Sequence, residues 1–153
     1  MPSLHICASY TTQLTNPRDQ NLPLPGGAKT YTGDLTYYGT GLGACGVTST
    51  DNDLIVSISH FVFDAMQSGS DPNKNPLCGK KLRAQRDNNG KTVSVDLTVV
   101  DRCACAILLF ARPYANIVKG TGCQPNDIDV SPAVFKKLAD MDLGRVSVTW
   151  AWL

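Results

Sequence analysis

Two carboxylates on a short alternating stretch are the first residues of this chain that could do chemistry. In Asn-Asp-Ile-Asp-Val-Ser-Pro, at residues 126–132, alternation places Ile128 and Val130 on one side of a short strand and Asp127 and Asp129 on the other. A carboxylate held on rigid structure at a strand end is a candidate functional group, as a proton donor or as a hydrogen-bond acceptor. The competing interpretation is that both aspartates are solvated turn residues.

The residues after this strand predict a helix that would hold the carboxylates in place. Ser131 can cap the helix by accepting an N–H bond, and Pro132 suits the first helical position because its missing N–H is not needed there. We therefore expect a helix over residues 133–140. Its apolar side chains have the spacing of one buried stripe, which comprises Val134, Phe135, Leu138 and Met141.

Most of the remaining chain has the pattern of strands joined by short links. Strands are expected at residues 32–39, 53–59, 78–86, 91–100, 127–130 and 144–152. Asn89 and Gly90 are expected to form a hairpin turn, because both tolerate a positive φ. A mainly β chain of this kind favours a closed barrel with one or two short helices.

Composition and charge exclude several classes of function. The 153 residues suffice for one domain, and a net charge of +1 predicts neither nucleic-acid binding nor a basic membrane surface. No apolar run approaches the ~20 residues of a membrane span. Neither the lone His60 nor the pair Cys103 and Cys105 has the spacing of a zinc site. We therefore expect no metal and no other cofactor, and we interpret His60 as structural or groove-lining.

The cysteine content and the start of the chain give conflicting indications about secretion. Six cysteines in a chain of this size predict an oxidising compartment. Residues 1–10 nevertheless have neither the basic start nor the apolar core of a secretory signal, and we interpret the start as incomplete. Residues 1–31 have the composition of an irregular lead-in, so the domain is expected at residues 32–153. We expect the protein to be an extracellular monomer.

Five segments, in this order, resemble the fungal expansin-like, loosenin-like proteins. They are residues 33–39, 43–46, 78–81, 99–103 and 127–132, and the ending at 143–152 is similar too. These proteins are single double-psi β-barrel domains, related to the barrel of rare lipoprotein A, to barwin and to the endoglucanases of glycoside hydrolase family 45. The resemblance implies a six-stranded double-psi β-barrel with an open polysaccharide groove across one face.

The resemblance also implies roles for single residues. Asp129 stands where expansins carry the aspartate that matches the general acid of the related endoglucanases. Asp101 matches a second groove aspartate, and Thr36 and Tyr38 match the threonine and the aromatic residue of the first expansin motif. One of Tyr37 and Tyr38 is expected to pack in the barrel, and the other to offer a flat face to a sugar ring.

A missing carboxylate decides the expected mechanism. The related hydrolases carry a base after the first-strand aromatic residue, where this chain has Gly39. Inverting hydrolysis needs two carboxylates about 6.5–9.5 Å apart, and the resemblance places Asp101 beside the acid rather than across the scissile bond. We therefore expect non-hydrolytic binding and loosening. Asp129 and Asp101 would hydrogen-bond the hydroxyl groups of a cell-wall polysaccharide, either a β-glucan such as cellulose or chitin.

Two other function classes stay open. The first is a weak endoglucanase or lytic transglycosylase that uses Asp129 as its acid, with Asp101 as a substitute base. The second is a protein-binding barrel, because barrels of this type also resemble a small bacterial cysteine-protease inhibitor and plant defence proteins. Release of soluble sugar would favour the first class, and inhibition of papain would favour the second.

An apolar insertion at residues 105–121 departs from the family, which has a short Cys-x-x-Cys loop at this point. Such a run is unusual for a surface loop, and we interpret it as a retained intron or a gene-model error; the rival is a real loop that covers the groove or binds a partner. Without it, Cys103 and Cys123 become near neighbours and could pair, and Cys45 and Cys78 could form the other bridge. Four cysteines allow three connectivities, and the sequence does not choose among them.

Overall fold

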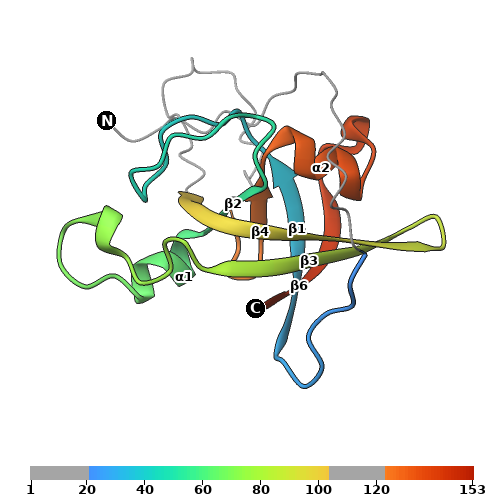
Figure 1. Ribbon diagram of the computed structural model, residues 1–153, viewed down its shortest axis with the longest axis horizontal. Helices are drawn as coiled ribbons and strands as arrows, with labels where there is room; N and C mark the ends of the chain where they lie inside the picture. Colours follow the sequence, from blue (N-terminus) through green and yellow to red (C-terminus); the bar gives the residue numbers. More distant parts are fainter. Residues whose placement is uncertain (1–20, 104–122) are drawn as a thin grey trace, which may run out of the picture.

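The computed structural model describes residues 21–103 and 123–153 (Figure 1). The irregular lead-in lies mostly outside the described residues, and the insertion at 105–121 lies entirely outside them. The strands are β1 (Thr30–Tyr37), β2 (Ile55–Ser59), β3 (Lys81–Asn88), β4 (Lys91–Cys103), β5 (Ile128–Val130) and β6 (Val146–Trp152). The helices are α1 (His60–Ala65) and α2 (Pro132–Leu138), with 3-10 turns η1 (Pro72–Lys74) and η2 (Met141–Leu143).

The six strands close into a barrel, as the sequence predicts. The order around the barrel is β1-β5-β2-β4-β3-β6, so neighbours in space are often distant in the chain. β1 pairs in parallel with β5, and β2 pairs in parallel with β4, whereas the other pairs are antiparallel. The three-residue strand β5 therefore closes the wall between β1 and β2.

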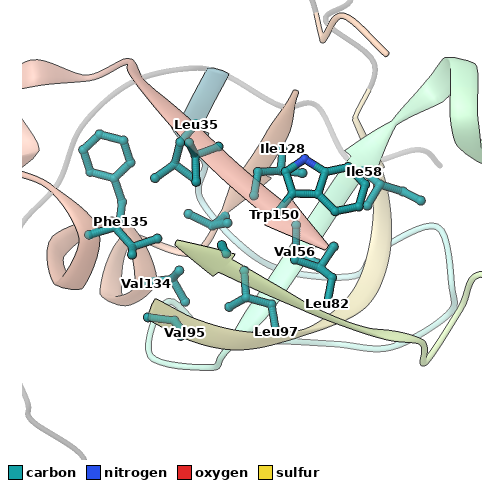
Figure 2. Close-up of a cluster of buried hydrophobic side chains, with 14 of the residues drawn as sticks. Leu35, Val56, Ile58, Leu82, Val95, Leu97, Ile128, Val134, Phe135 and Trp150 are labelled. Carbon is teal, nitrogen blue, oxygen red and sulfur yellow. The ribbon is translucent and has the colours of Figure 1, made fainter. Parts of the chain in front are cut away.

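Alternating apolar side chains fill the barrel interior (Figure 2). Leu35 from β1, Ile128 from β5 and Trp150 from β6 are at most 2% exposed and point toward one another. Val95, Leu97 and Val99, which the alternation of β4 predicts to share a face, lie in the same cluster. Because side chains on a strand point alternately to its two faces, the residues that alternate with these on each strand must face the outside of the barrel.

The helix α2 covers one end of the barrel and is capped as predicted. The Ser131 side chain accepts a hydrogen bond from the Val134 N–H at 3.4 Å, and Pro132 occupies the first turn. Val134, Phe135 and Leu138 are fully buried. The helix ends at Leu138, short of the expected residue 140. Asp140 instead caps η2 by accepting the Asp142 N–H at 3.0 Å.

The turns fix where the strands begin. Asn89 and Gly90 have φ values of 55° and 80°, which confirms the predicted hairpin turn between β3 and β4. β3 begins at Lys81 rather than at Cys78, because Cys78 lies in a turn in which Gly79 has a φ of 80°. β1 ends at Tyr37, two residues before the expected end.

Two disulfides join segments that flank the barrel. Cys45 is bonded to Cys78 and Cys103 to Cys123, with Cα–Cα distances of 5.6 and 6.1 Å. This is one of the three connectivities that the sequence leaves open. Within the described ranges, none of the helices has the length and apolar character needed to cross a membrane.

We predict that Gly33→Ala destabilises the barrel, because a Cβ there would lie 2.6 Å from the Asn126 carbonyl carbon and 2.8 Å from Asp127 Oδ1. Overpacking against backbone should lower the free energy of unfolding by about 1–3 kcal/mol in urea titrations. Gly39→Ala is the matched control, because a Cβ there meets nothing within 4 Å. Equal stability of the two variants would contradict the prediction.

Candidate functional site

Four polar residues on consecutive strands form a row across the outer face of the barrel wall. Thr36 on β1 is in register with Asp129 on β5, Asp129 with Ser57 on β2, and Ser57 with Asp101 on β4. We call Thr36, Asp129, Ser57 and Asp101 the polar row. The structure thus brings together three residues predicted from distant parts of the sequence, and it adds Ser57, which the sequence analysis missed.

A β-bulge places Asp101 in this row. Val56 pairs with Val99, but the next residue of β2, Ser57, pairs with Asp101, so β4 carries Val100 as an extra residue. Continued alternation after Val99 would turn Asp101 into the apolar interior. The bulge re-aims it to the outer face, which is a common use of such irregularities beside functional sites.

The polar row is buried rather than open. Ser57, Asp129 and Asp101 are 0%, 2% and 4% exposed, and Thr36 is half-buried. The Thr36 hydroxyl donates to Asp129 Oδ1 at 2.9 Å. Within the described parts of the chain, Ser57 Oγ is a buried side-chain oxygen without a hydrogen-bond partner. The interpretation of Asp129 as a solvated turn residue is therefore wrong.

Tyr38 lies beside both aspartates of the row. Burial raises the pKa of its phenol, and the nearby carboxylates of Asp101, Asp129 and Asp51 raise that pKa further, because a second negative charge is unfavourable there. The ring belongs to a small apolar cluster with Ile55 and Val100. Tyr38 is thus a neutral group at the centre of an acidic cluster.

Neither tyrosine offers an exposed face to a sugar ring. Tyr37 is 6% exposed and packs against Phe135, with ring centroids 4.7 Å apart. Tyr38 is only 2% exposed. The prediction that one of them packs in the barrel is confirmed for Tyr37. The prediction of a stacking platform is not met by the described geometry, because Tyr38 covers Ile55 and Val100 on the outside of the wall.

Asp101 holds a loop against the barrel. Its Oδ1 accepts the backbone N–H of Ala44 and that of Arg102, both at 2.8 Å. Next to this contact, the Cys45 N–H donates to the Val100 carbonyl at 3.1 Å. The predicted groove aspartate therefore positions a loop.

We call residues 39–50 the anchored loop. Its two ends are joined by hydrogen bonds from the Gly43 N–H to the Val47 carbonyl and from the Ser49 N–H to the Gly41 carbonyl, both at 2.9 Å. The Cys45–Cys78 disulfide ties the loop to the segment before β3. At its start, Thr40 donates from its N–H and its hydroxyl to Asp51 Oδ1, at 3.0 and 2.8 Å.

Asp127 and His60 have structural roles. Asp127 is 7% exposed, and its two oxygens accept the N–H groups of Asp34 and Gln124, both at 2.8 Å, so it too is no solvated turn residue. His60 Nδ1 lies 3.2 Å from the Cys103 carbonyl oxygen, and its ring packs against that of Phe61 in a tilted arrangement. The described ranges contain no group of three or more His, Cys, Asp or Glu residues that could hold a metal.

Asp51 is a further acidic residue that the sequence analysis missed. It lies beside Thr40, next to the position where the related hydrolases are expected to carry their base, and its charge acts on Tyr38. The only signal for Asp51 in the sequence is its position in a polar turn. A cavity of about 520 Å³ lies elsewhere, between β6 and the parts of β3 and β4 next to their turn, and its lining includes none of the predicted site residues.

Comparisons with known proteins match this chain to papain inhibitors, to an expansin and to an allergen homologue. The papain inhibitor of Streptomyces mobaraensis is 28% identical over 155 aligned residues, which cover 99% of this chain and 89% of that protein. The solved structure of a Streptomyces papain inhibitor matches with a TM-score of 0.58 and 29% identity, over 86% of this chain and 99% of that one. No family model matches the chain.

Two further matches cover only half or less of the known protein. The expansin of Clavibacter michiganensis, solved in complex with cellohexaose, matches with a TM-score of 0.55 and 17% identity, over 82% of this chain and 50% of that one. An Asp f 7 allergen homologue of Arthroderma benhamiae is 31% identical over 124 residues, or 74% of this chain and 34% of that protein. The chain therefore shares the double-psi-barrel-like fold of the papain inhibitor and the expansin.

We predict that Asp101→Ala releases the anchored loop. Two backbone N–H groups lose their acceptor, which should lower the free energy of unfolding by about 2–4 kcal/mol. Amide hydrogen exchange at Ala44 should also become faster. The control is Asp142→Ala, at an exposed carboxylate in η2, which should change stability by less than about 0.5 kcal/mol. Unchanged exchange at Ala44 would contradict the assigned role.

Proposed function

We propose that this barrel is a protein-binding inhibitor of papain-like cysteine proteases. The observation that carries the proposal is that both aspartates of the polar row have structural surroundings. Asp101 holds a loop, and Asp129 is 2% exposed beside a neutral tyrosine. These carboxylates do not form an open acid–base pair. The likeness to the papain inhibitor extends over nearly the whole chain, which supports the same conclusion.

Rigidity of the presented surface suits this function. Protease–inhibitor complexes form with little backbone movement, and most of their affinity comes from surfaces that are already in the bound conformation. The anchored loop meets this requirement through the Asp101 contact, the Cys45–Cys78 disulfide and its internal hydrogen bonds. In this proposal the protein acts as an extracellular monomer. The two disulfides support the extracellular location, because disulfides persist in an oxidising compartment.

Papain inhibition by the purified chain tests this function. We expect competitive inhibition with a Ki at or below about 1 μM, in the range of specific protein complexes. The assay uses a small peptide substrate, and trypsin serves as the control enzyme, because its catalytic site is built differently. Inhibition of papain but not of trypsin is the expected result. Full papain activity at a large excess of the chain would overturn the proposal.

Polysaccharide binding is the second candidate, and a specific contact favours it. The Thr36–Asp129 hydrogen bond joins two residues that the expansin resemblance matches to the groove. In this alternative the chain is a fungal loosenin-like protein that binds a β-glucan or chitin without cutting it, and Asp129 accepts hydrogen bonds from sugar hydroxyl groups. Hydrolysis would additionally need a base, for which Asp101 is unsuited because its Oδ1 already accepts two backbone N–H groups.

Pull-down on amorphous cellulose and chitin tests the second candidate. If it holds, the parent is retained, and Asp129→Ala lowers retention at least about tenfold, the loss expected for one charge-assisted hydrogen bond. Asp142→Ala is the matched control and should bind as the parent does. New reducing ends, which report hydrolysis, are measured in the same tubes. The assay is then repeated on the form without residues 105–121. No retention of either form would exclude this candidate.

A further inference from the structure

We propose that the anchored loop enters the substrate cleft of the protease, with Leu42 and Val47 as the two side chains that fill apolar pockets there. This inference rests on the inhibitory function proposed above. It adds which surface makes the contact and which chemistry the partner must offer. In Figure 1 the loop is part of the teal segment that follows β1.

Leu42 and Val47 are exposed although the loop that carries them is held tightly. They are 55% and 48% exposed, and the Gly43 N–H to Val47 carbonyl hydrogen bond places them on opposite sides of the loop tip. Leu42 is also bridged to Thr48, so the two sides of the tip run antiparallel. Two aliphatic side chains on one small, ordered loop are the kind of anchor that fills pockets at interface centres.

The backbone beneath the tip leaves the loop no room to shift toward the barrel. A Cβ at Gly43 would meet the Val100 carbonyl oxygen and would lie 3.1 Å from its carbon. Gly46 has a φ of +75°, and a Cβ there would lie 2.9 Å from the Asn73 side chain. The loop is therefore seated directly on β4 and η1. Because this order exists before binding, little conformational entropy is lost when a partner binds.

The composition of the loop defines its partner. Residues 39–50 contain glycine, alanine, threonine, serine, one cysteine and the two aliphatic residues, with no charged and no aromatic side chain. A sugar chain would be met by aromatic faces, and an anionic polymer by cationic side chains. A slender, uncharged loop with two aliphatic side chains instead fits a narrow protein cleft that accepts apolar residues. The substrate cleft of a cysteine protease is such a partner.

Substitution of the two aliphatic residues tests this assignment. Leu42→Asp and Val47→Asp should each raise the Ki for papain at least about 30-fold, the loss expected for a buried anchor at an interface. Leu143→Asp is the matched control, because Leu143 in η2 is 56% exposed and receives the same charge. Its Ki should stay within about twofold of the parent. Leu42→Ser provides an uncharged replacement. Thermal unfolding of the parent and all four variants checks that they fold.

The outcomes separate this inference from the function on which it rests. If the parent does not inhibit papain, the proposed function fails, and the loop assignment fails with it. If the parent inhibits and the Leu42 and Val47 variants inhibit equally well, only the loop assignment is overturned. A second readout uses papain whose catalytic cysteine carries a bulky peptide-like alkylating group. It should no longer bind the chain, and unchanged binding would place the contact outside the cleft and overturn the assignment.

Discussion

The closure of the barrel depends on three residues, Ile128 to Val130, which form β5. This strand lies between β1 and β2, two strands that come much earlier in the chain. Strand β5 runs parallel to β1 and antiparallel to β2, and both of its apolar side chains lie in the core. The approach to this strand is fixed by the Trp150 indole N–H, which donates to the Asn126 carbonyl at 2.8 Å. Without β5, β1 and β2 would each leave an open edge, and the outer row of polar side chains would not be continuous.

The outer face then links the barrel to the loop that the protein presents. Asp129 is part of the strand that closes the wall, Ser57 lies beside it, and Asp101 continues the row to the backbone of Ala44. Burial of the two aspartates strengthens the hydrogen bonds that they accept, because the local dielectric is lower than that of water. The strand pairing that forms the wall thus also positions Asp101, whose hydrogen bond to the Ala44 N–H holds the anchored loop.

The sequence predicted the closed six-stranded barrel, the hairpin at Asn89 and the cap at Ser131, because each depends on local propensity or on alternation. It also grouped Thr36, Asp101, Asp129 and Tyr38, but through the resemblance rather than through spacing. It did not predict that these residues are buried, since burial depends on how loops fold over the wall. Ser57 and Asp51 were missed because they join the cluster only through strand register and a loop contact.

The extra residue in β4 makes the surface and the interior depend on one another. Val100 is the residue that has no partner of its own on β2, and it lets a valine at 99 and an aspartate at 101 face opposite sides of the wall. Without the bulge, an unbroken alternation through the same residues would turn the Asp101 carboxylate toward Val95 and Leu97. The outward direction of the carboxylate that holds the anchored loop and the apolar interior of the barrel thus depend on the same irregularity.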